Sequence, residues 1–187
     1  MTVTSRFPLP DLDALPEDLR QRILEIQEKT GFVPNVFLVL AHRPAELRAF
    51  LALHDALVDT DVGLSKADRE LIIVATSAAN DCIYCVVAHG AILRIRSRQP
   101  ELSDQVATNY LKAPLTERQR LMVEFARKVA TVSAAVEDAD IELLTTAGFT
   151  LDEVWDIGAI TALFAYSNRM ANFTGMMPNR EFYGMGR

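Results

Sequence analysis

The sequence has little of what stabilises small secreted domains or crosses membranes. Only two cysteines occur among 187 residues, so a framework of several disulfides is excluded. Residues 1–16 contain no apolar stretch that could form the core of a signal peptide. The most apolar window, residues 154–166, contains Asp156 and is too short to span a bilayer. These absences predict a cytoplasmic protein without a membrane partner.

A basic surface is also missing. The net charge is −6, and the only short basic group is formed by Arg94, Arg96 and Arg98. We interpret this group as a solvated helix end, where cations offset the negative end of the helix dipole. An acidic chain repels phosphate backbones and anionic lipid heads. The sequence therefore predicts no nucleic-acid partner and no membrane surface as a partner.

What the sequence does contain is typical of a folded helical protein. Half of the residues are hydrophobic and 24% are charged, which excludes a disordered chain. No segment alternates apolar and polar residues with the period of a strand. After Pro44, by contrast, apolar residues recur at helical spacing. The fold class predicted is an all-α bundle.

Proline, glycine and capping residues predict where the helices begin and end. One helix is expected from Pro16-Glu17 to about Lys29, stopped by Gly31. Further helices are expected after Pro34, after Pro44 and after Pro100, and one begins near Asp81. Three more begin at the cap-like runs Ser65–Asp68, Thr116–Gln119 and Thr150–Glu153.

Cys82 and Cys85 are the residues most indicative of chemistry, because they form a Cys-x-x-Cys pair. Asn80-Asp81 is predicted to cap a helix, which places both cysteines in its first turn. The positive end of the helix dipole and the free backbone N–H groups lower the pKa of a thiol there. Residues three apart on a helix are close enough for a disulfide. The pair therefore predicts thiol redox chemistry.

His89 and Glu70 are predicted to assist the cysteines. His89 follows Cys85 by four residues, so its imidazole lies on the same helix face and can reach the Cys85 sulfur. Glu70 precedes the apolar run 71–75, where a carboxylate is costly unless it is paired. If the two helices pack as a hairpin, Glu70 hydrogen-bonds His89. This would form a carboxylate–imidazole–thiol relay.

Other interpretations remain open at this point. His42 and His54 are interpreted as structural, with His54 near the site only if its helix packs there, and Tyr84 as a packing residue with a polar tip. A zinc site is the main alternative for the cysteines, although no second Cys-x-x-Cys or histidine pair accompanies them. The four zinc ligands would be Cys82, Cys85, His89 and Glu70.

The run from Glu70 through Cys82-Ile83-Tyr84-Cys85 to His89 resembles the signature of the alkylhydroperoxidase AhpD family, within the carboxymuconolactone decarboxylase-like superfamily. Residues 31–37, Arg43-Pro44 and 168–171 resemble the peroxidase-related branch of that superfamily. The resemblance covers roughly residues 15–180. It implies a single AhpD-like domain over residues 1–187, with an N-terminal helical segment of about 1–60, a catalytic core of about 61–175 and a C-terminal tail of about 176–187.

The resemblance also implies an activity. The chain is similar to peroxidase-type thiol oxidoreductases that reduce hydroperoxides, and Cys85 would be the peroxidatic cysteine. Cys82 would donate a proton and then resolve the sulfenic acid into a disulfide, while Glu70 and His89 would form the proton relay. No cofactor is implied beyond an external dithiol reductant, thioredoxin-like or lipoyl. A homo-oligomer, a trimer or hexamer, is implied as well.

One residue departs from the family pattern, and two other functions remain open. Tyr84 stands where AhpD carries a histidine, and a phenol does not act as a base near neutral pH. One alternative function is a disulfide reductase without a peroxide substrate. The other is a non-enzymatic helical oligomer that binds zinc or senses oxidation. A lactone decarboxylase has no use for a Cys-x-x-Cys pair.

Overall fold

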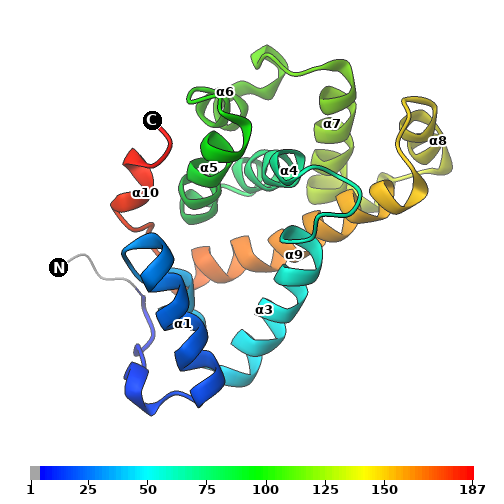
Figure 1. Ribbon diagram of the computed structural model, residues 1–187. Coiled ribbons are helices and arrows are strands. Elements are labelled where there is room, and N and C mark those ends of the chain that lie inside the picture. The colour runs from blue at the N-terminus through cyan, green and yellow to red at the C-terminus, as the bar shows by residue number, and fades with distance from the viewer. Residues whose placement is uncertain (1–4) are drawn as a thin grey trace.

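The computed structural model describes residues 5–187, and this part of the chain is helical with no strand, which confirms the all-α prediction (Figure 1). Residues 1–4, with which the predicted domain and the segment predicted to contain no signal-peptide core begin, lie outside the described residues. Three short 3-10 turns accompany the α-helices. The α-helices are α1 (Glu17–Thr30), α2 (Asn35–Leu40), α3 (Pro44–Val58), α4 (Lys66–Ala79), α5 (Ile83–Ser97), α6 (Leu102–Asn109), α7 (Glu117–Val132), α8 (Asp138–Thr146), α9 (Leu151–Thr174) and α10 (Glu181–Gly184).

Most helix boundaries follow from the local sequence. The side chains of Ser65, Thr116 and Thr150 each accept the backbone N–H three residues later, as N-caps do. Gly31 ends α1 with φ of 83°, a conformation that favours glycine. Helix α8 was not predicted. Its first turn is closed by a capping box of two carboxylates, Glu137 and Asp140, in place of the hydroxyl side chains that cap α4, α7 and α9.

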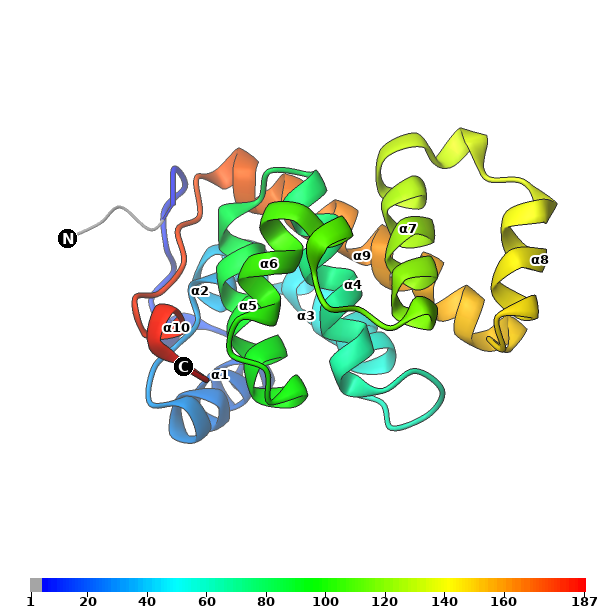
Figure 2. The same cartoon turned by 90° about the horizontal axis from the view of Figure 1, so that it is seen from above.

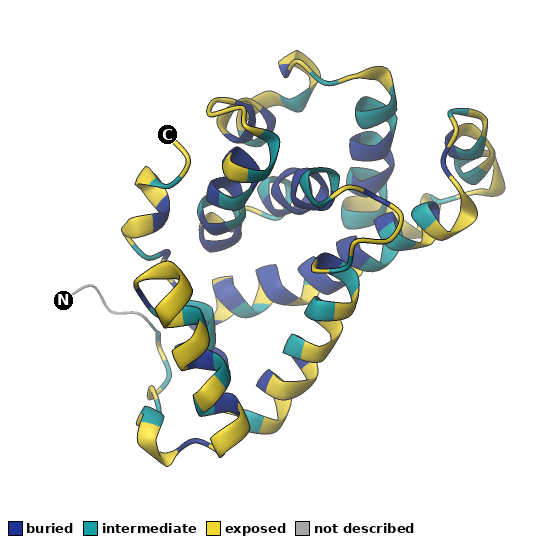
Figure 3. Cartoon of the chain, in the orientation of Figure 1, coloured by how far each residue is buried: buried dark blue, intermediate teal, exposed yellow. Residues whose placement is uncertain are grey.

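Helix α4 is the centre of the fold. It packs against α5, α6, α7 and α9, and Figure 1 shows it nearly end-on among them. All residues from 69 to 77 are buried, which appears as the dark-blue centre in Figure 3. Because neighbours surround α4, any polar side chain on it needs a partner inside the protein. This requirement applies to Glu70.

The interpretation of Arg94 and Arg96 as part of a solvated helix end was wrong. Arg94 is buried, and it donates hydrogen bonds to the carbonyl oxygens of Met185, at 2.9 Å, and Phe182, at 2.8 Å. The segment containing α10 folds back over α5 and brings these carbonyls to Arg94 (Figure 2). Arg96 pairs with the buried Glu70 and the half-exposed Asp59, as described below. Of the three arginines, Arg98 alone is exposed as expected.

No helix in residues 5–187 combines the length and apolar character that a membrane crossing requires.

Candidate active site

The connection between α4 and α5 determines where the two thiols lie. Asp81 has a positive φ of 51° and turns the chain between the helices. The predicted cap was wrong by one residue, because Cys82 itself is the N-cap of α5. Its Sγ accepts the backbone N–H of Cys85 at 3.4 Å. A sulfur thus takes the place that a hydroxyl or carboxylate usually occupies, at the positive end of the helix dipole.

Helix α9 contributes two polar side chains to the thiol pair. Both thiols are free and buried, and the Sγ of Cys85 lies 3.7 Å from the Oγ of Ser167. The next residue, Asn168, is fully buried. Its amide donates to Ser77 Oγ and accepts from Asn80 Nδ2, both at 2.9 Å. Asn168 was noticed only within a family-like run, and Ser167 was missed, because nothing in the local sequence shows that α9 faces the cysteines.

The two thiols have opposite pKa shifts. A hydrogen bond from the Cys85 thiol, followed by the backbone N–H of Cys85, lowers the pKa of Cys82 to about 7 against the effect of burial. The same pairing with Cys82, together with burial, raises the pKa of Cys85. The two thiols are therefore coupled. The pKa for the loss of the first proton is a property of the pair and not of one sulfur. Of the two sulfurs Cys82 has the lower pKa, whereas the resemblance implies ionisation of Cys85; the roles of the two sulfurs stay a prediction.

This coupling predicts a thiolate at neutral pH. Because the pKa of the pair is lowered to about 7, the thiolate absorbance of one sulfur should rise through pH 7, and alkylation should accelerate over the same range. Replacing either cysteine with alanine removes the hydrogen bond between the two side chains, so the remaining sulfur should titrate at higher pH. Ultraviolet titration of the reduced protein and the two variants measures this. A wild-type midpoint at the value of a free thiol would contradict it.

Glu70 and His89 are hydrogen-bonded, as the hairpin prediction required. The Oε2 of Glu70 lies 2.8 Å from the Nδ1 of His89, and Glu70 is 1% exposed. A carboxylate can only accept, so Nδ1 carries the proton. The Nε2 atom of His89 is then the free base. This tautomer suits a residue that must take a proton from a thiol.

Arg96 is a member of this network that the sequence reasoning missed. Its Nη1 lies 3.0 Å from the Oε1 of Glu70, as an ion pair without hydrogen-bond alignment. Its Nη2 hydrogen-bonds the Oδ1 of Asp59 at 3.1 Å. Arg96 follows His89 by seven residues, two turns along the same helix face, which is the signal that would have found it. The arginine supplies the positive charge that a buried carboxylate needs.

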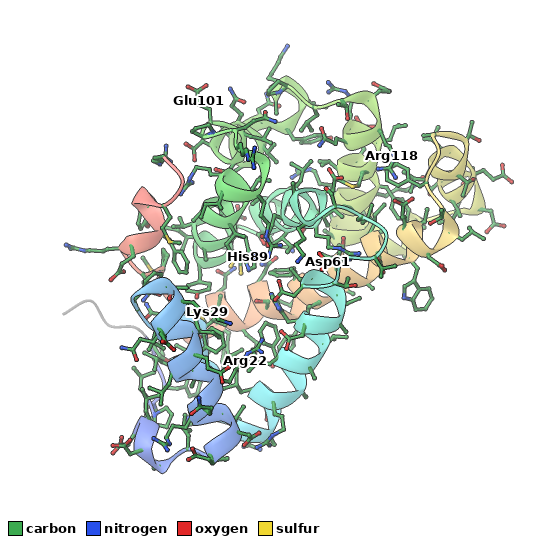
Figure 4. The ribbon with its side chains drawn as sticks, in the orientation of Figure 1. Arg22, Lys29, Asp61, His89, Glu101 and Arg118 are labelled. Atoms are coloured by element: carbon green, nitrogen blue, oxygen red, sulfur yellow. The ribbon has the colours of Figure 1, made fainter. Side chains whose placement is uncertain are left out.

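A cavity of about 640 Å³ adjoins this network, between α1, α3 and α5. Figure 4 shows His89 near the middle of the molecule and Arg22 and Lys29 on α1 across from it. Ser167 and His89 form part of the wall. The cavity therefore reaches Ser167, which contacts Cys85, and His89, which follows Cys85 by four residues in the sequence. Most of the remaining wall is apolar, and the volume suits a small organic molecule. Apolar wall residues include Phe37, Phe50, Leu51, Ile92 and Phe182.

His54 also lines the cavity, because its helix does pack at the site. Its ring centroid lies 6.4 Å from that of His89. Burial, followed by the proximity of His89, lowers the pKa of His54, so its imidazole is neutral at pH 7. Helix α3 brings it there by packing on α9. This packing cannot be deduced from helical periodicity.

His54, Asp55 and Asp59 place possible metal-ligand atoms within 4.8 Å of one another. Arginines already neutralise both carboxylates. Arg22 lies 2.7 Å from Asp55, and Arg96 lies 3.1 Å from Asp59. Because a divalent cation needs uncompensated oxygen or nitrogen ligands, this group does not fit a metal site.

The alternative zinc site fits the geometry poorly. One oxygen of Glu70 is bonded to His89 and the other is paired with Arg96. To become the fourth zinc ligand, Glu70 would have to leave both partners. The structure therefore favours Glu70 as part of a proton relay.

Tyr84 and His42 have the structural roles expected of them. The Tyr84 hydroxyl accepts the backbone N–H of Val36 at 3.2 Å, and burial raises its pKa. His42 lies 3.2 Å from the carbonyl oxygen of Pro8 and its ring packs beside Phe7.

Comparisons with known proteins identify the family of the chain. The model of the carboxymuconolactone decarboxylase family matches residues 44–101, which include both cysteines, His89 and Glu70. A crystal structure described as an alkylhydroperoxidase AhpD core, an uncharacterized peroxidase-related protein from Ralstonia eutropha JMP134, has 62% identity and a TM-score of 0.98, over 100% of this chain and 98% of that one. An uncharacterized peroxidase-related protein from Silicibacter sp. TM1040 has 42% identity and a TM-score of 0.93, over 98% and 96%.

A more distant structure shows the same fold. The debrominase Bmp8 has 20% identity and a TM-score of 0.78, over 97% of this chain and 95% of that one. Comparison with curated protein sequences gives no match. The two similar structures, which align over nearly the whole chain, decide the relationship: the chain belongs to the AhpD-like, peroxidase-related proteins of the carboxymuconolactone decarboxylase-like superfamily.

Proposed function

We propose that this protein reduces an organic hydroperoxide through Cys82 and Cys85, with Glu70 and His89 as the proton relay. One observation carries the proposal. Two buried thiols share a helix start, where the sulfur of Cys82 accepts the N–H of Cys85. Beside them lies the hydrogen-bonded pair Glu70–His89. Glu70 belongs to the neighbouring helix α4, and His89 belongs to the next turn of α5. A thiol pair with one near-neutral pKa and an oriented base has what a thiol peroxidase needs.

The first step forms a sulfenic acid on Cys85. The resting pair has one thiolate on Cys82 and one thiol on Cys85, and His89 holds the proton that the pair has lost. The Cys85 proton passes to Cys82, and the Cys85 thiolate attacks the outer peroxide oxygen. The S–O bond forms as the O–O bond breaks, and sulfur gives up two electrons. The alkoxide leaves as an alcohol with the proton of Cys82.

The second step forms the disulfide. The Cys82 thiolate attacks the sulfur of the sulfenic acid, so the S–S bond forms and the S–O bond breaks. The departing hydroxide takes the proton from the imidazolium of His89 and leaves as water. Glu70, held by Arg96, stabilises that imidazolium until then. The sum is one hydroperoxide and two thiols converted to an alcohol, water and a disulfide.

An external dithiol then restores the thiols, so no bound cofactor is required. One of its thiolates attacks the Cys82–Cys85 disulfide, and its second thiol completes the exchange. Both cysteines are 1% exposed. This burial favours a slender dithiol such as a lipoyl arm over the surface of a thioredoxin-like protein. The proposal places the protein in the cytoplasm, where such reductants are available.

Burial of the thiols also bears on the alternative functions. A disulfide reductase acting on proteins would need a sulfur that a folded partner can touch, whereas a small peroxide can enter the cavity. The zinc alternative requires Glu70 to give up two partners. The proposed peroxidase activity requires neither a sulfur that a folded protein can touch nor the release of Glu70 from His89 and Arg96.

The test is mass spectrometry of the reduced protein before and after one equivalent of cumene hydroperoxide. An intramolecular disulfide lowers the intact mass by about two units, and peptide mapping should join Cys82 to Cys85. A double serine variant of the two cysteines is the control and should not change in mass. Parallel assays follow peroxide consumption with reduced lipoamide, disulfide exchange and metal content.

Two outcomes would contradict the proposal. Rapid disulfide exchange without peroxide consumption would identify a reductase. Stoichiometric zinc in protein purified without chelator, with no thiol open to titration, would identify a metal site.

A further inference from the structure

The last residues of the chain form part of the cavity wall. Phe182, in α10, and Met185 both line the cavity. Phe182 is buried and belongs to the same apolar cluster as Cys82 and Cys85. Its ring meets that of Phe32 edge to face, with ring centroids 5.0 Å apart. We call residues 176–187 the C-terminal segment, and its apolar side chains belong to the site.

A buried charge holds the C-terminal segment beside α5, where Figure 2 shows α10. Arg94 is 4% exposed. Its Nε donates to the carbonyl oxygen of Met185 at 2.9 Å, its Nη2 to that of Phe182 at 2.8 Å, and its Nη1 to Ser103 Oγ at 3.2 Å. A buried guanidinium is costly when its N–H groups lack acceptors. Because two of these three acceptors belong to the segment, its departure would leave the charge poorly compensated.

The sequence of the C-terminal segment also suits this position. Gly186 has a φ of 72°, and a Cβ atom there would lie 2.9 Å from Arg94 Cβ and 3.1 Å from Ile95 Cγ1. Only glycine allows so close an approach to α5. On the other side of α10, the Asn179 side chain accepts the backbone N–H of Asn35 at 2.8 Å. The segment is thus tied both before and after the residues that line the cavity.

We propose that the C-terminal segment sets the substrate class, because Phe182 and Met185 form a fixed wall of the cavity. The substrate is a compact hydroperoxide with an aryl or branched alkyl group, and a long linear chain is excluded. The inference rests on the proposed peroxidase function, since it concerns the substrate of the same site. A wall tied on both sides does not yield to a chain that needs its space.

The composition of the wall selects an aryl group. The rings of Phe37, Phe50 and Phe182 all line the cavity of about 640 Å³. Aromatic rings pack favourably edge to face or offset, so an aryl group gains contacts that a linear chain does not make. A linear chain also loses more conformational freedom on binding. Both effects favour the compact aryl substrate at the cavity that His89 borders.

The experiment compares kcat/KM for cumene hydroperoxide and for decyl hydroperoxide, with reduced lipoamide as the reductant. The wild type should prefer cumene hydroperoxide by about tenfold or more. Phe182→Ala makes room for the chain and should lower this preference, mainly through a lower KM for decyl hydroperoxide. Phe182→Trp fills the same space and should raise the preference. Tyr183→Ala is the matched control, because Tyr183 is 48% exposed and does not line the cavity; its preference should equal that of the wild type.

Arg94→Met tests whether the buried charge positions the wall. Methionine fills much of the space of the arginine but donates to neither carbonyl group, so the segment should detach more often. The preference should then fall as it does in Phe182→Ala. Arg94→Lys retains the charge and can donate to one carbonyl group, so it should recover part of the preference. Lower stability of Arg94→Met with an unchanged ratio of the two kcat/KM values would show a merely structural role.

A binding measurement makes the test independent of turnover. Titration calorimetry of the reduced protein with the two product alcohols, cumyl alcohol and decanol, should show the same preference and the same changes in the variants. If the wild type reduced neither hydroperoxide, the proposed function would fail, while this binding preference would still decide the inference.

Three results would overturn the inference. The first is a wild type without preference in either measurement. The second is a preference that Phe182→Ala and Phe182→Trp leave unchanged or move in the same direction. The third is an equal change in Tyr183→Ala.

Discussion

Replacing Cys85 with serine is expected to lower the rate of hydroperoxide reduction by about a thousandfold or more, because the attacking sulfur is lost. Serine preserves the size of the side chain and its contact with Ser167, so the fold should be unchanged. Peroxide consumption with reduced lipoamide measures the loss. Unchanged turnover in this variant would rule out Cys85 as the peroxidatic residue.

Replacing Cys82 with serine is the matched control, and it separates attack from resolution. Turnover should also stop, but Cys85 should still react once and remain as a sulfenic acid that dimedone traps. The lower pKa of Cys82 makes the opposite assignment a clear alternative. Dimedone on Cys82 in the Cys85→Ser protein, and none on Cys85 in the Cys82→Ser protein, would reverse the two roles.

Replacing Arg96 with methionine is expected to slow the reaction by about a hundredfold, the size of a general-base contribution. Glu70 is 1% exposed and keeps only His89 as its charged partner when Arg96 is removed. Without the guanidinium beside it, the Glu70 carboxylate stabilises the His89 imidazolium more strongly, so a higher pH is needed to free the imidazole base. The acid limb of the pH–rate profile should move upward by about one pH unit. The free energy of unfolding should fall by about 2 kcal/mol, because a buried charge loses its counterion.

Arg96→Lys and Glu70→Gln are the variants that distinguish proton transfer from structural support. Lysine keeps the positive charge and should restore most of the rate and the position of the acid limb. Glutamine keeps the size of Glu70 but removes its charge, so it should slow the reaction about as much as Arg96→Met. If Arg96→Met lost stability with a normal pH–rate profile, Arg96 would be only structural.

Local sequence was sufficient for most of the secondary structure. Hydroxyl side chains at Ser65, Thr116 and Thr150 satisfy the free N–H groups of a helix start wherever the helix lies in the protein. Gly31 stops α1 because only glycine adopts its backbone conformation without strain. The cap of α5 was missed by one residue, because a cysteine sulfur rarely takes that place.

The candidate site was only partly predictable, because its members come from separate helices. The spacing of Cys82, Cys85 and His89 lies within one helix, so helical geometry alone relates them. Glu70 was found because a carboxylate before an apolar run needs a partner. Arg96 was misassigned to solvent, since a charged residue near a helix end usually lies there.

By itself, the sequence determined most of the helices, the thiol pair and the histidine beside it, because these depend on interactions between residues close in the chain. Only the tertiary structure decided that α9 brings Ser167 to Cys85, that α3 brings His54 into the cavity, and that Arg96 pairs with Glu70. Those contacts depend on which helix faces pack together. Packing is selected by the shape of the whole core, and many arrangements bury the same apolar residues.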